Sequence, residues 1–516
     1  MKRIIYHGFG KPYSAAILST LYRKYKWIPV SMTGVALDEN NNLDDVPLDD
    51  CIISNPMRIR RAEFDYERIG PPIYIDDEIL KKLSIYEGTY IDMLGVAQDA
   101  TGLLYPYSDR KNFYIDVLTY WNTIIHRKKP DILVFYTWPH TPSCYALYIL
   151  AKYGHGIDIL FIDFVPLLDE WLHLIQCSLE DLSYPLNLGF DTAENDNIRN
   201  KAFKSELTYD EIPKHIELDI NAFETSTPLL NRLVNFSKNK FKVSAVEKIG
   251  SFFKGEFIDW KANIKPYDQP DSRMNRLQLF LLFEKIKYKN RKLKKYYNQQ
   301  TNKPVLSEDY IYFSAPYQPE ALSMMVGSGY TNILLTLSVL SSACPSGWTI
   351  YYKEHPATFF DSLQGSIKRN NWFYERLSKF KNIKMVHSNY NQFELIKNSK
   401  AVALVTGSAA WEAVIRGRPV ISFAQGWYSG LKGIINVESL QDVHDAIELI
   451  QRGFKPNAND VSKYAAIVRE VAFKFPEHYS QANFDEKRAE LIADEFYKAY
   501  LRLYNNQDST NNCKIH

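Results

Sequence analysis

Apolar residues recur along the chain in short runs that alternate with helical segments, a pattern typical of a parallel α/β protein. In the clearest unit, Ala401-Val-Ala-Leu-Val405 predicts a buried strand and Ala409 to Arg416 predicts a helix. Thr406-Gly-Ser408 forms the turn between them, with Ser408 at or near the helix N-cap. A further strand is predicted at Val420 to Phe423. This βαβ unit directs backbone N–H groups at the space above the turn, an environment that suits an anion.

The same alternation recurs elsewhere and indicates more than one α/β unit. Further strands are predicted at Arg3–His7, Trp27–Ser31, Ile132–Tyr136, Ile157–Phe161, Tyr310–Ala315, Trp348–Lys353 and Ile383–Val386, with helices between them. A chain of 516 residues is too long for one hydrophobic core. We therefore predict two α/β domains.

The polar stretches between these units set the predicted domain boundaries. We expect an N-terminal domain with a helical insertion, a basic helix with a linker, a second α/β domain, a C-terminal helix that crosses back and a disordered tail, at residues 1–265, 266–305, 306–480, 481–505 and 506–516. The long helix at Arg273 to Tyr297 is apolar in its first half and basic from Lys285 to Lys295. Its basic half predicts either a solvated end or contact with an anionic membrane surface or acidic glycan.

Composition narrows the class of protein. The net charge of +2 gives no general attraction to nucleic acid. The five cysteines show no CxxC spacing, which favours reduced thiols over a disulfide framework or a zinc site. The first apolar run is too short for a signal peptide, and no run reaches the ~20 apolar residues of a membrane span. These features predict a cytoplasmic protein.

Three polar loops of the second domain follow predicted strands. They are Gln318-Pro-Glu320, Lys353-Glu-His-Pro356 and Thr406-Gly-Ser408, the last with Glu412 one helical turn further on. Because the carboxyl ends of parallel strands share one sheet edge, these loops can meet at one ligand. A nucleotide sugar needs phosphate donors and an acceptor for sugar hydroxyls, which His355, Ser408 and Glu412 supply. For His355 alone, a structural role is the more common alternative.

In the first domain, acidic residues follow the strand predicted at Ile157 to Phe161. Asp163, Asp169 and Glu170 are therefore candidate acid or base groups at the end of a strand. For each of them taken singly, a solvated loop charge is the more common alternative. No Asp-x-Asp motif stands at the end of a predicted strand, so the sequence predicts no metal site.

Three segments, YFSAPYQPEA, YYKEHP and VTGSAAWEAVIRGRPVISF, resemble the bacterial capsule and surface polysaccharide glycosyltransferases. These include transferases of Kdo and related acidic sugars that use CMP-sugars. The resemblance is strongest over residues 273–440 and weaker over 112–170. It implies the GT-B arrangement, which has two Rossmann-like domains facing a cleft, here with a C-terminal helix crossing back.

The resemblance also implies roles for individual residues. It assigns nucleotide-phosphate contact to His355 and Pro356, and it places Lys353 in the same loop. The Ser/Thr-Gly turn and the glutamate after it map to Thr406, Gly407, Ser408 and Glu412, while the carboxylate loop maps to Gln318 and Glu320. Glu320 is the expected catalytic carboxylate, and Asp163 or Glu170 is the expected partner for the acceptor proton.

We therefore expect a metal-independent glycosyltransferase that needs no cofactor beyond its nucleotide-sugar donor. The leading donor is CMP-Kdo or a related acidic CMP-sugar, and the acceptor is a glycan or a lipid-linked glycan. From the basic helix we also expect peripheral contact with the inner membrane. The alternatives are a UDP-sugar transferase, an enzyme resembling UDP-GlcNAc 2-epimerase, and a non-catalytic protein that binds glycan.

Overall fold

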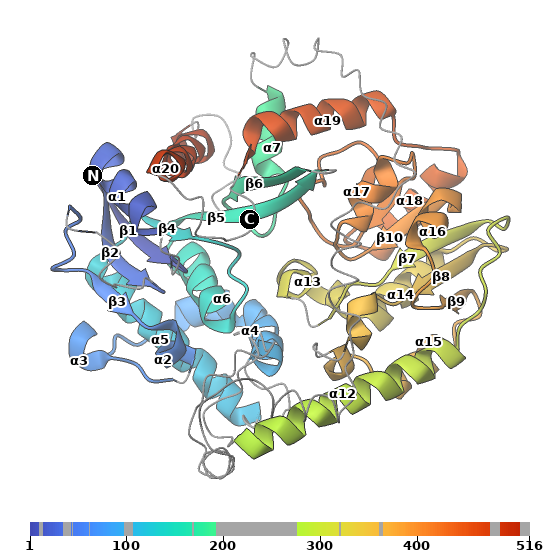
Figure 1. Ribbon diagram of the computed structural model, residues 1–516, viewed down its shortest axis with the longest axis horizontal. Helices are drawn as coiled ribbons and strands as arrows, with labels where there is room; N and C mark the ends of the chain where they lie inside the picture. The colour runs from blue at the N-terminus through green and yellow to red at the C-terminus, as the bar shows by residue number, and fades with distance from the viewer. Residues whose placement is uncertain are drawn as a thin grey trace, which may run out of the picture.

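The structure is a computed structural model with two α/β domains side by side (Figure 1). It describes residues 1–9, 14–34, 43, 45–60, 62–97, 107–167, 170–191, 276–318, 321–360, 365–474 and 486–505. Most of the predicted helical insertion at 180–265 and the whole tail at 506–516 lie outside these residues. None of the described helices is long and apolar enough to cross a membrane.

The first domain is built on a seven-stranded sheet with the order β13-β6-β5-β4-β1-β2-β3. Its strands are β1 (Lys2–His7), β2 (Trp27–Thr33), β3 (Ile52–Ser54), β4 (Ile132–Phe135), β5 (Asp158–Leu167), β6 (Glu170–Gln176) and β13 (Phe473–Lys474). Pairing is parallel from β3 to β5, whereas β6 is antiparallel to both β5 and β13. Its helices are α1 (Ser14–Tyr25), α2 (Pro56–Arg60), α3 (Tyr66–Ile69), α4 (Asp77–Ala97), α5 (Tyr107–Lys128), α6 (Pro142–Ile149), η1 (Leu150–Gly154) and α7 (Tyr184–Asp191).

The second domain contains a six-stranded parallel sheet with the order β12-β11-β10-β7-β8-β9. Its strands are β7 (Tyr310–Ser314), β8 (Thr349–Lys353), β9 (Ile383–Val386), β10 (Ala401–Leu404), β11 (Val420–Ser422) and β12 (Ile434–Asn436). Its helices are α12 (Arg276–Gln299), α13 (Ala321–Val326), η3 (Ser328–Thr331), α14 (Ile333–Ala343), η4 (Pro356–Phe359), η5 (Gly365–Ile367), α15 (Asn371–Leu377), α16 (Gln392–Asn398), α17 (Ala409–Val414), α18 (Leu440–Gln451) and α19 (Ala458–Val471).

In both sheets the order of strands reverses next to the first strand of the domain. The chain runs from β1 to β2 and β3 on one side and then passes to β4 on the other side. In the second domain it runs from β7 to β8 and β9 before β10 begins the opposite side. In open α/β sheets, ligands bind at the carboxyl ends of the strands beside such a reversal.

The strands form because their apolar residues are buried by helices on both faces. All four residues of β10 are buried, as the apolar run at Ala401 predicts. The helix after it ends near Gly417, which adopts a φ of +69°, a conformation that glycine tolerates without strain. This βαβ unit follows the sequence prediction closely.

A β-hairpin of the first sheet reaches the core of the second domain. Leu172 and Leu174 of β6 belong to the same buried cluster as Trp411 and Trp427. The sequence predicts that the strand ends at Phe161, and this is wrong, because β5 continues to Leu167. Its extension is stabilised by antiparallel pairing with β6 and by apolar contacts with the second domain.

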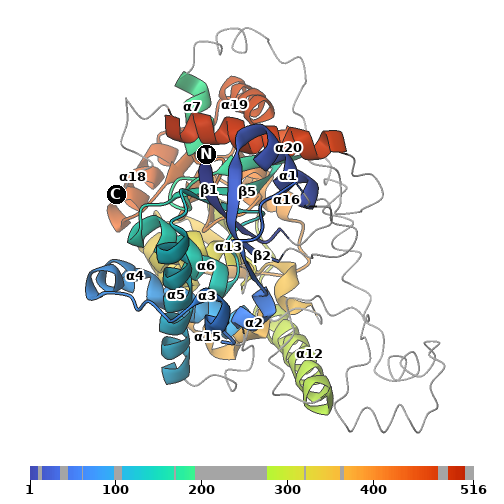
Figure 2. The same cartoon turned by 90° about the vertical axis from the view of Figure 1, so that its left-hand side faces the viewer.

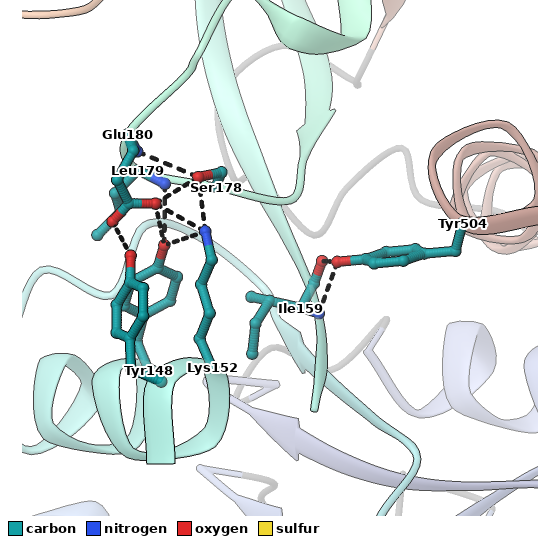
Figure 3. Close-up of polar contacts among 8 residues, drawn as sticks. Tyr148, Lys152, Ile159, Ser178, Leu179, Glu180 and Tyr504 are labelled. Carbon is teal, nitrogen blue, oxygen red and sulfur yellow. Dashed lines mark hydrogen bonds and ion pairs between the residues drawn. The ribbon is translucent and has the colours of Figure 1, made fainter. Parts of the chain in front are cut away.

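The C-terminal segment returns to the first domain as α20 (Glu486–Tyr500), followed by η7 (Leu501–Asn505). Helix α20 lies alongside α1, where the rings of Tyr25 and Tyr497 stack at 3.8 Å (Figure 2). The Tyr504 hydroxyl bonds both backbone groups of Ile159, each at 2.9 Å (Figure 3). The predicted fold class of two Rossmann-like α/β domains, with a C-terminal helix crossing back, is confirmed. The return begins at β13, before the predicted boundary at residue 480.

Candidate functional site

The three polar loops predicted to meet follow β7, β8 and β10, which are neighbours at the centre of the second sheet. The point where the strand order reverses lies between β10 and β7. The loop after β7 leads into α13, which packs against α4 of the first domain (Figure 1). The candidate site therefore lies at the edge of the second sheet that the first domain approaches.

Lys353 is the last residue of β8 and is only 4% exposed. It lies on the sheet face of Tyr351, because side chains alternate along a strand and Tyr352 packs in the opposite core. Among the residues that the structure describes, it makes no ion pair within 4 Å. Burial lowers its pKa to about 8, against the opposing effect of Glu354 and Glu412. The site thus holds a buried ammonium group that no carboxylate of the described residues neutralises directly.

His355 has exposed surface, although its imidazole is closely surrounded by protein. This crowding and the charge of Lys353 lower its pKa to about 4, so the ring is neutral at pH 7. Its Nδ1 accepts the backbone N–H of Ala357 at 3.2 Å, which caps η4, while Pro356 begins that helix. The remaining ring nitrogen, Nε2, therefore carries the proton. His355 therefore caps a helix, which is the structural role that the sequence offered as the alternative. Its Nε2–H group remains for a ligand.

Glu412 lies on the first turn of α17 and is 6% exposed. It accepts hydrogen bonds from the Ser408 hydroxyl at 3.0 Å and from Gln392 Nε2 at 3.2 Å. Burial raises its pKa, and these bonds together with Arg416 oppose the shift. Ser408 occupies the predicted N-cap position, but its hydroxyl bonds this carboxylate instead of capping the helix.

Gly407 adopts a φ of +139°, and a Cβ atom there would meet nothing within 4 Å. The sequence predicts free backbone N–H groups at this turn, but the N–H of Gly407 is not one of them. The Gly407 N–H donates to the Tyr428 hydroxyl at 3.1 Å, and Thr406 Oγ1 lies 3.4 Å from the same oxygen. Helix α17 has six residues, so its dipole is small.

Gln318 is buried after β7, and its side chain points away from solvent toward Arg369. Arg369 also pairs with Glu354, the residue between Lys353 and His355. No local pattern in the sequence marks Arg369 or Glu354 as a residue of the site. Glu320 lies outside the described residues, so its predicted catalytic role stays a prediction.

In the first domain, Asp163 lies within β5 and not at its end, since the strand continues to Leu167. It is 3% exposed and accepts hydrogen bonds from Trp138 Nε1 at 2.7 Å and Gln176 Nε2 at 3.2 Å. Burial raises its pKa to about 7, although these bonds favour the ionised form. Glu170 begins β6 opposite Leu167, and Asp169 lies outside the described residues.

A second polar cluster lies where the strand order of the first sheet reverses. His7, the last residue of β1, has its Nε2 2.8 Å from the Cys144 sulfur and its Nδ1 bonded to the Thr33 hydroxyl. The Thr141 hydroxyl lies 2.7 Å from the same sulfur. Within the described residues, no group of three or more His, Cys, Asp or Glu side chains has the geometry of a metal site.

The second domain matches a known family. Residues 285–466 match the family model described as "Capsule polysaccharide biosynthesis protein". This segment is similar to capsule polysaccharide biosynthesis proteins. It runs from the basic half of α12 into α19 and so contains β7, β8 and β10 with the three polar loops that follow them. The predicted resemblance to capsule polysaccharide proteins is confirmed over this domain.

Solved structures give only weak likenesses. Two transferase structures of KpsC from Thermosulfurimonas dismutans, titled beta Kdo 2,7 and beta Kdo 2,4 transferase, are 10% and 11% identical to the chain with TM-scores of 0.31 and 0.28. They cover 73% and 76% of this chain and 88% of each of those chains. UDP-GlcNAc 2-epimerase from Methanocaldococcus jannaschii is 15% identical with a TM-score of 0.24, over 91% of this chain and 99% of that chain. No curated protein matches the sequence. At these scores the likenesses assign no function to the chain.

Proposed function

We propose that the protein is a glycosyltransferase of capsule or surface polysaccharide biosynthesis that binds its nucleotide-sugar donor on the second domain. The observation that carries this proposal is Lys353, a buried ammonium group without an ion pair among the described residues. Burying an uncompensated charge costs stability, so such a group is typical of a site that receives an anion. Its position at the end of β8, close to the reversal of strand order, is where a nucleotide phosphate binds in this class of sheet.

The residues around Lys353 give the donor further contacts. The Nε2–H of His355 donates to a phosphate oxygen, and the Lys353 ammonium balances the phosphate charge. An ionised carboxylate has about four acceptor positions, and Glu412 uses two of them for Ser408 and Gln392. The others remain for sugar hydroxyls.

The leading donor is a CMP-activated acidic sugar such as CMP-Kdo. One ammonium group and one neutral N–H group suit the single phosphate of a CMP-sugar better than the diphosphate of a UDP-sugar. This preference also rests on the sequence resemblance to Kdo transferases. We propose that the reaction needs no metal, because Lys353 supplies the positive charge that a metal ion otherwise supplies.

In the proposed reaction, the bond from the anomeric carbon to the phosphate oxygen breaks and a bond to the acceptor oxygen forms. Glu320 stabilises or attacks the positively charged sugar, and a first-domain carboxylate takes the proton of the acceptor hydroxyl. Asp163 is the better-supported base, because its pKa of about 7 lets it hold and release a proton at neutral pH.

The acceptor is a glycan or lipid-linked glycan bound on the first domain, and α12 places the enzyme at an anionic membrane surface. One side of α12 is buried through Ile286, Asn290, Leu293 and Tyr297. The other side exposes Lys285, Lys289, Arg291, Lys292 and Lys295. Exposed cations of one sign attract anionic headgroups, each contributing about 1 kcal/mol near the surface.

A thermal-shift panel of CMP, CDP, UDP and GDP tests the proposal. The nucleotide of the donor should stabilise the protein by ~2.7 kcal/mol at about 100 times its Kd. A response to CMP supports the leading donor, whereas a response to UDP moves the proposal to a UDP-sugar. Incubation with UDP-GlcNAc alone then separates a transferase from an epimerase, because an epimerase needs no acceptor. If no nucleotide stabilises the protein, it is a non-catalytic glycan-binding protein and the proposal fails.

A further inference from the structure

A buried arginine connects two loops of the candidate donor site. Arg369 follows η5 and is 2% exposed. Its Nε donates to Glu354 Oε2 at 3.0 Å, and its Nη1 donates to Gln318 Oε1 at 2.8 Å. Gln318 follows β7 and Glu354 follows β8, so one planar guanidinium group spans the ends of two neighbouring strands.

Both acceptors of Arg369 are held from their other sides as well. Glu354 is fully buried and accepts hydrogen bonds from the hydroxyls of Tyr352 at 2.6 Å and Tyr374 at 2.9 Å. The side-chain amide of Gln318 donates to the Thr331 carbonyl at 2.9 Å. Because neither acceptor is free to turn, the guanidinium group fixes the distance between the two loops.

The approach of the neighbouring backbone segments is equally constrained. A Cβ atom at Gly365, four residues before Arg369, would lie 2.2 Å from the Thr358 carbonyl oxygen. Asn290 of α12 donates to the Phe360 carbonyl at 2.7 Å and accepts the Ser366 N–H at 3.2 Å. The segment carrying Arg369 is therefore packed tightly against the loop that carries His355.

Stability alone does not account for this arginine. The Nη2 atom of Arg369 is buried without a hydrogen-bond partner among the described residues. A buried ion pair is a weak source of stability, and apolar residues in its place are often neutral or stabilising. An apolar residue in its place could not bond both loops and so could not fix the distance between them.

We propose that Arg369 is a positioning residue for donor binding: its planar fork sets the spacing between Gln318 and the Glu354–His355 turn. The inference rests on the proposed function for its effect on ligand affinity. It requires the shape of the guanidinium group and not only its charge, since a lysine presents a single point of charge and lacks the fork.

The test compares R369K with Y374F. R369K keeps a positive charge beside Glu354 but gives up the bond to Gln318, whereas Y374F removes one hydroxyl from Glu354 and leaves Gln318 untouched. Calorimetric titrations use CMP and UDP as probes. R369K should bind whichever of the two wild type binds, with an affinity at least about tenfold lower. Y374F should bind it within about twofold of wild type, although its melting temperature also falls.

Amide hydrogen exchange gives a readout that does not need a ligand. R369K should speed exchange in the loops Ala315–Gln318 and Glu354–His355, whereas Y374F should affect only the second. Unchanged exchange in the first loop of a folded R369K protein overturns the positioning role, and so does an equal loss of affinity in both variants. If wild type binds neither these two probes nor CDP or GDP, the proposed function fails, while the exchange result still decides the role of Arg369.

Discussion

Polar residues lie near the point of strand-order reversal in both sheets, but they differ in how far their polar atoms are already bonded within the protein. In the second domain, Lys353 is buried without an ion pair among the described residues and His355 keeps a protonated Nε2. In the first domain, His7 is held between Thr33 and Cys144, and both oxygens of Asp163 accept hydrogen bonds. On the proposed function, the groups of the second domain can therefore contact a donor as they stand. The first must exchange an internal hydrogen bond before it can act on a ligand.

The largest expected effect is that of replacing Asp163, which must give up an internal hydrogen bond to contact the acceptor. If Asp163 takes the acceptor proton, Asp163→Asn should lower turnover by about 10²–10⁴-fold and leave nucleotide affinity unchanged. A transfer assay beside a nucleotide titration measures both. Near-normal turnover would give Asp163 a purely structural role and would move the role of base to Glu170.

The stability of the same variant has a defined pH dependence. The pKa of Asp163 is about 7 in the fold and 3.8 ordinarily, so its protonated form stabilises the fold. That contribution is full below pH 4 and is lost as the pH rises through 7. Asp163→Asn should therefore have a higher melting temperature than wild type at pH 8 and the same one near pH 4.

Lys353 is expected to oppose folding while it serves binding. Lys353→Met should weaken nucleotide binding by ~3 kcal/mol, because it removes a charged donor from the phosphate. It should also stabilise the fold at pH 7, by up to ~3 kcal/mol for a pKa lowered from 10.5 to about 8. In wild type this penalty is full below pH 8 and disappears as the pH rises toward 10.5. Calorimetry and urea unfolding measure the two effects, and a variant that is weaker in both contradicts the unpaired state of Lys353.

His355 should show a smaller effect with a matched control. His355→Ala removes both the Nε2–H group and the cap of η4, and should weaken nucleotide binding by ~1.5 kcal/mol. His355→Asn keeps an acceptor for the Ala357 N–H, so it should recover stability but not affinity. If the asparagine variant restores affinity as well, His355 acts only as a helix cap.

The smallest effect concerns location. The exposed side of α12 should bind anionic vesicles at low salt and release them at high salt, because exposed charges are screened over ~8–10 Å. Replacing Lys285, Lys289 and Lys292 with glutamine should abolish co-sedimentation without changing nucleotide affinity. Binding that ignores salt would mean that charge does not drive it.

The sequence predicts the strands and loops of the candidate site well, but it predicts the hydrogen bonds between their side chains poorly. Apolar runs and glycine turns locate β7, β8 and β10, and therefore bring Lys353, His355 and Ser408 to one edge. Arg369 has no such signal, since it lies in a polar stretch without periodicity and meets Gln318 51 residues away in sequence. Such partners depend on tertiary packing, which no local pattern encodes.

The surroundings of Asp163 in the first domain are poorly predicted from the sequence for a related reason. The extension of β5 past Asp163 depends on a core supplied by the second domain. The bond from Trp138 to Asp163 depends on the register between a loop and a strand. Neither can be read from the residues that flank Asp163 in the chain.

The return of the C-terminal helix has a consequence for how the protein is made. Phe496, Leu503 and Tyr504 belong to the same buried cluster as Ile4 and Leu18 near the N-terminus. A ribosome delivers strands β1 to β6 of the first sheet hundreds of residues before it delivers α20. Until then that face of the sheet is exposed, so the second domain can fold during synthesis while the first waits for α20.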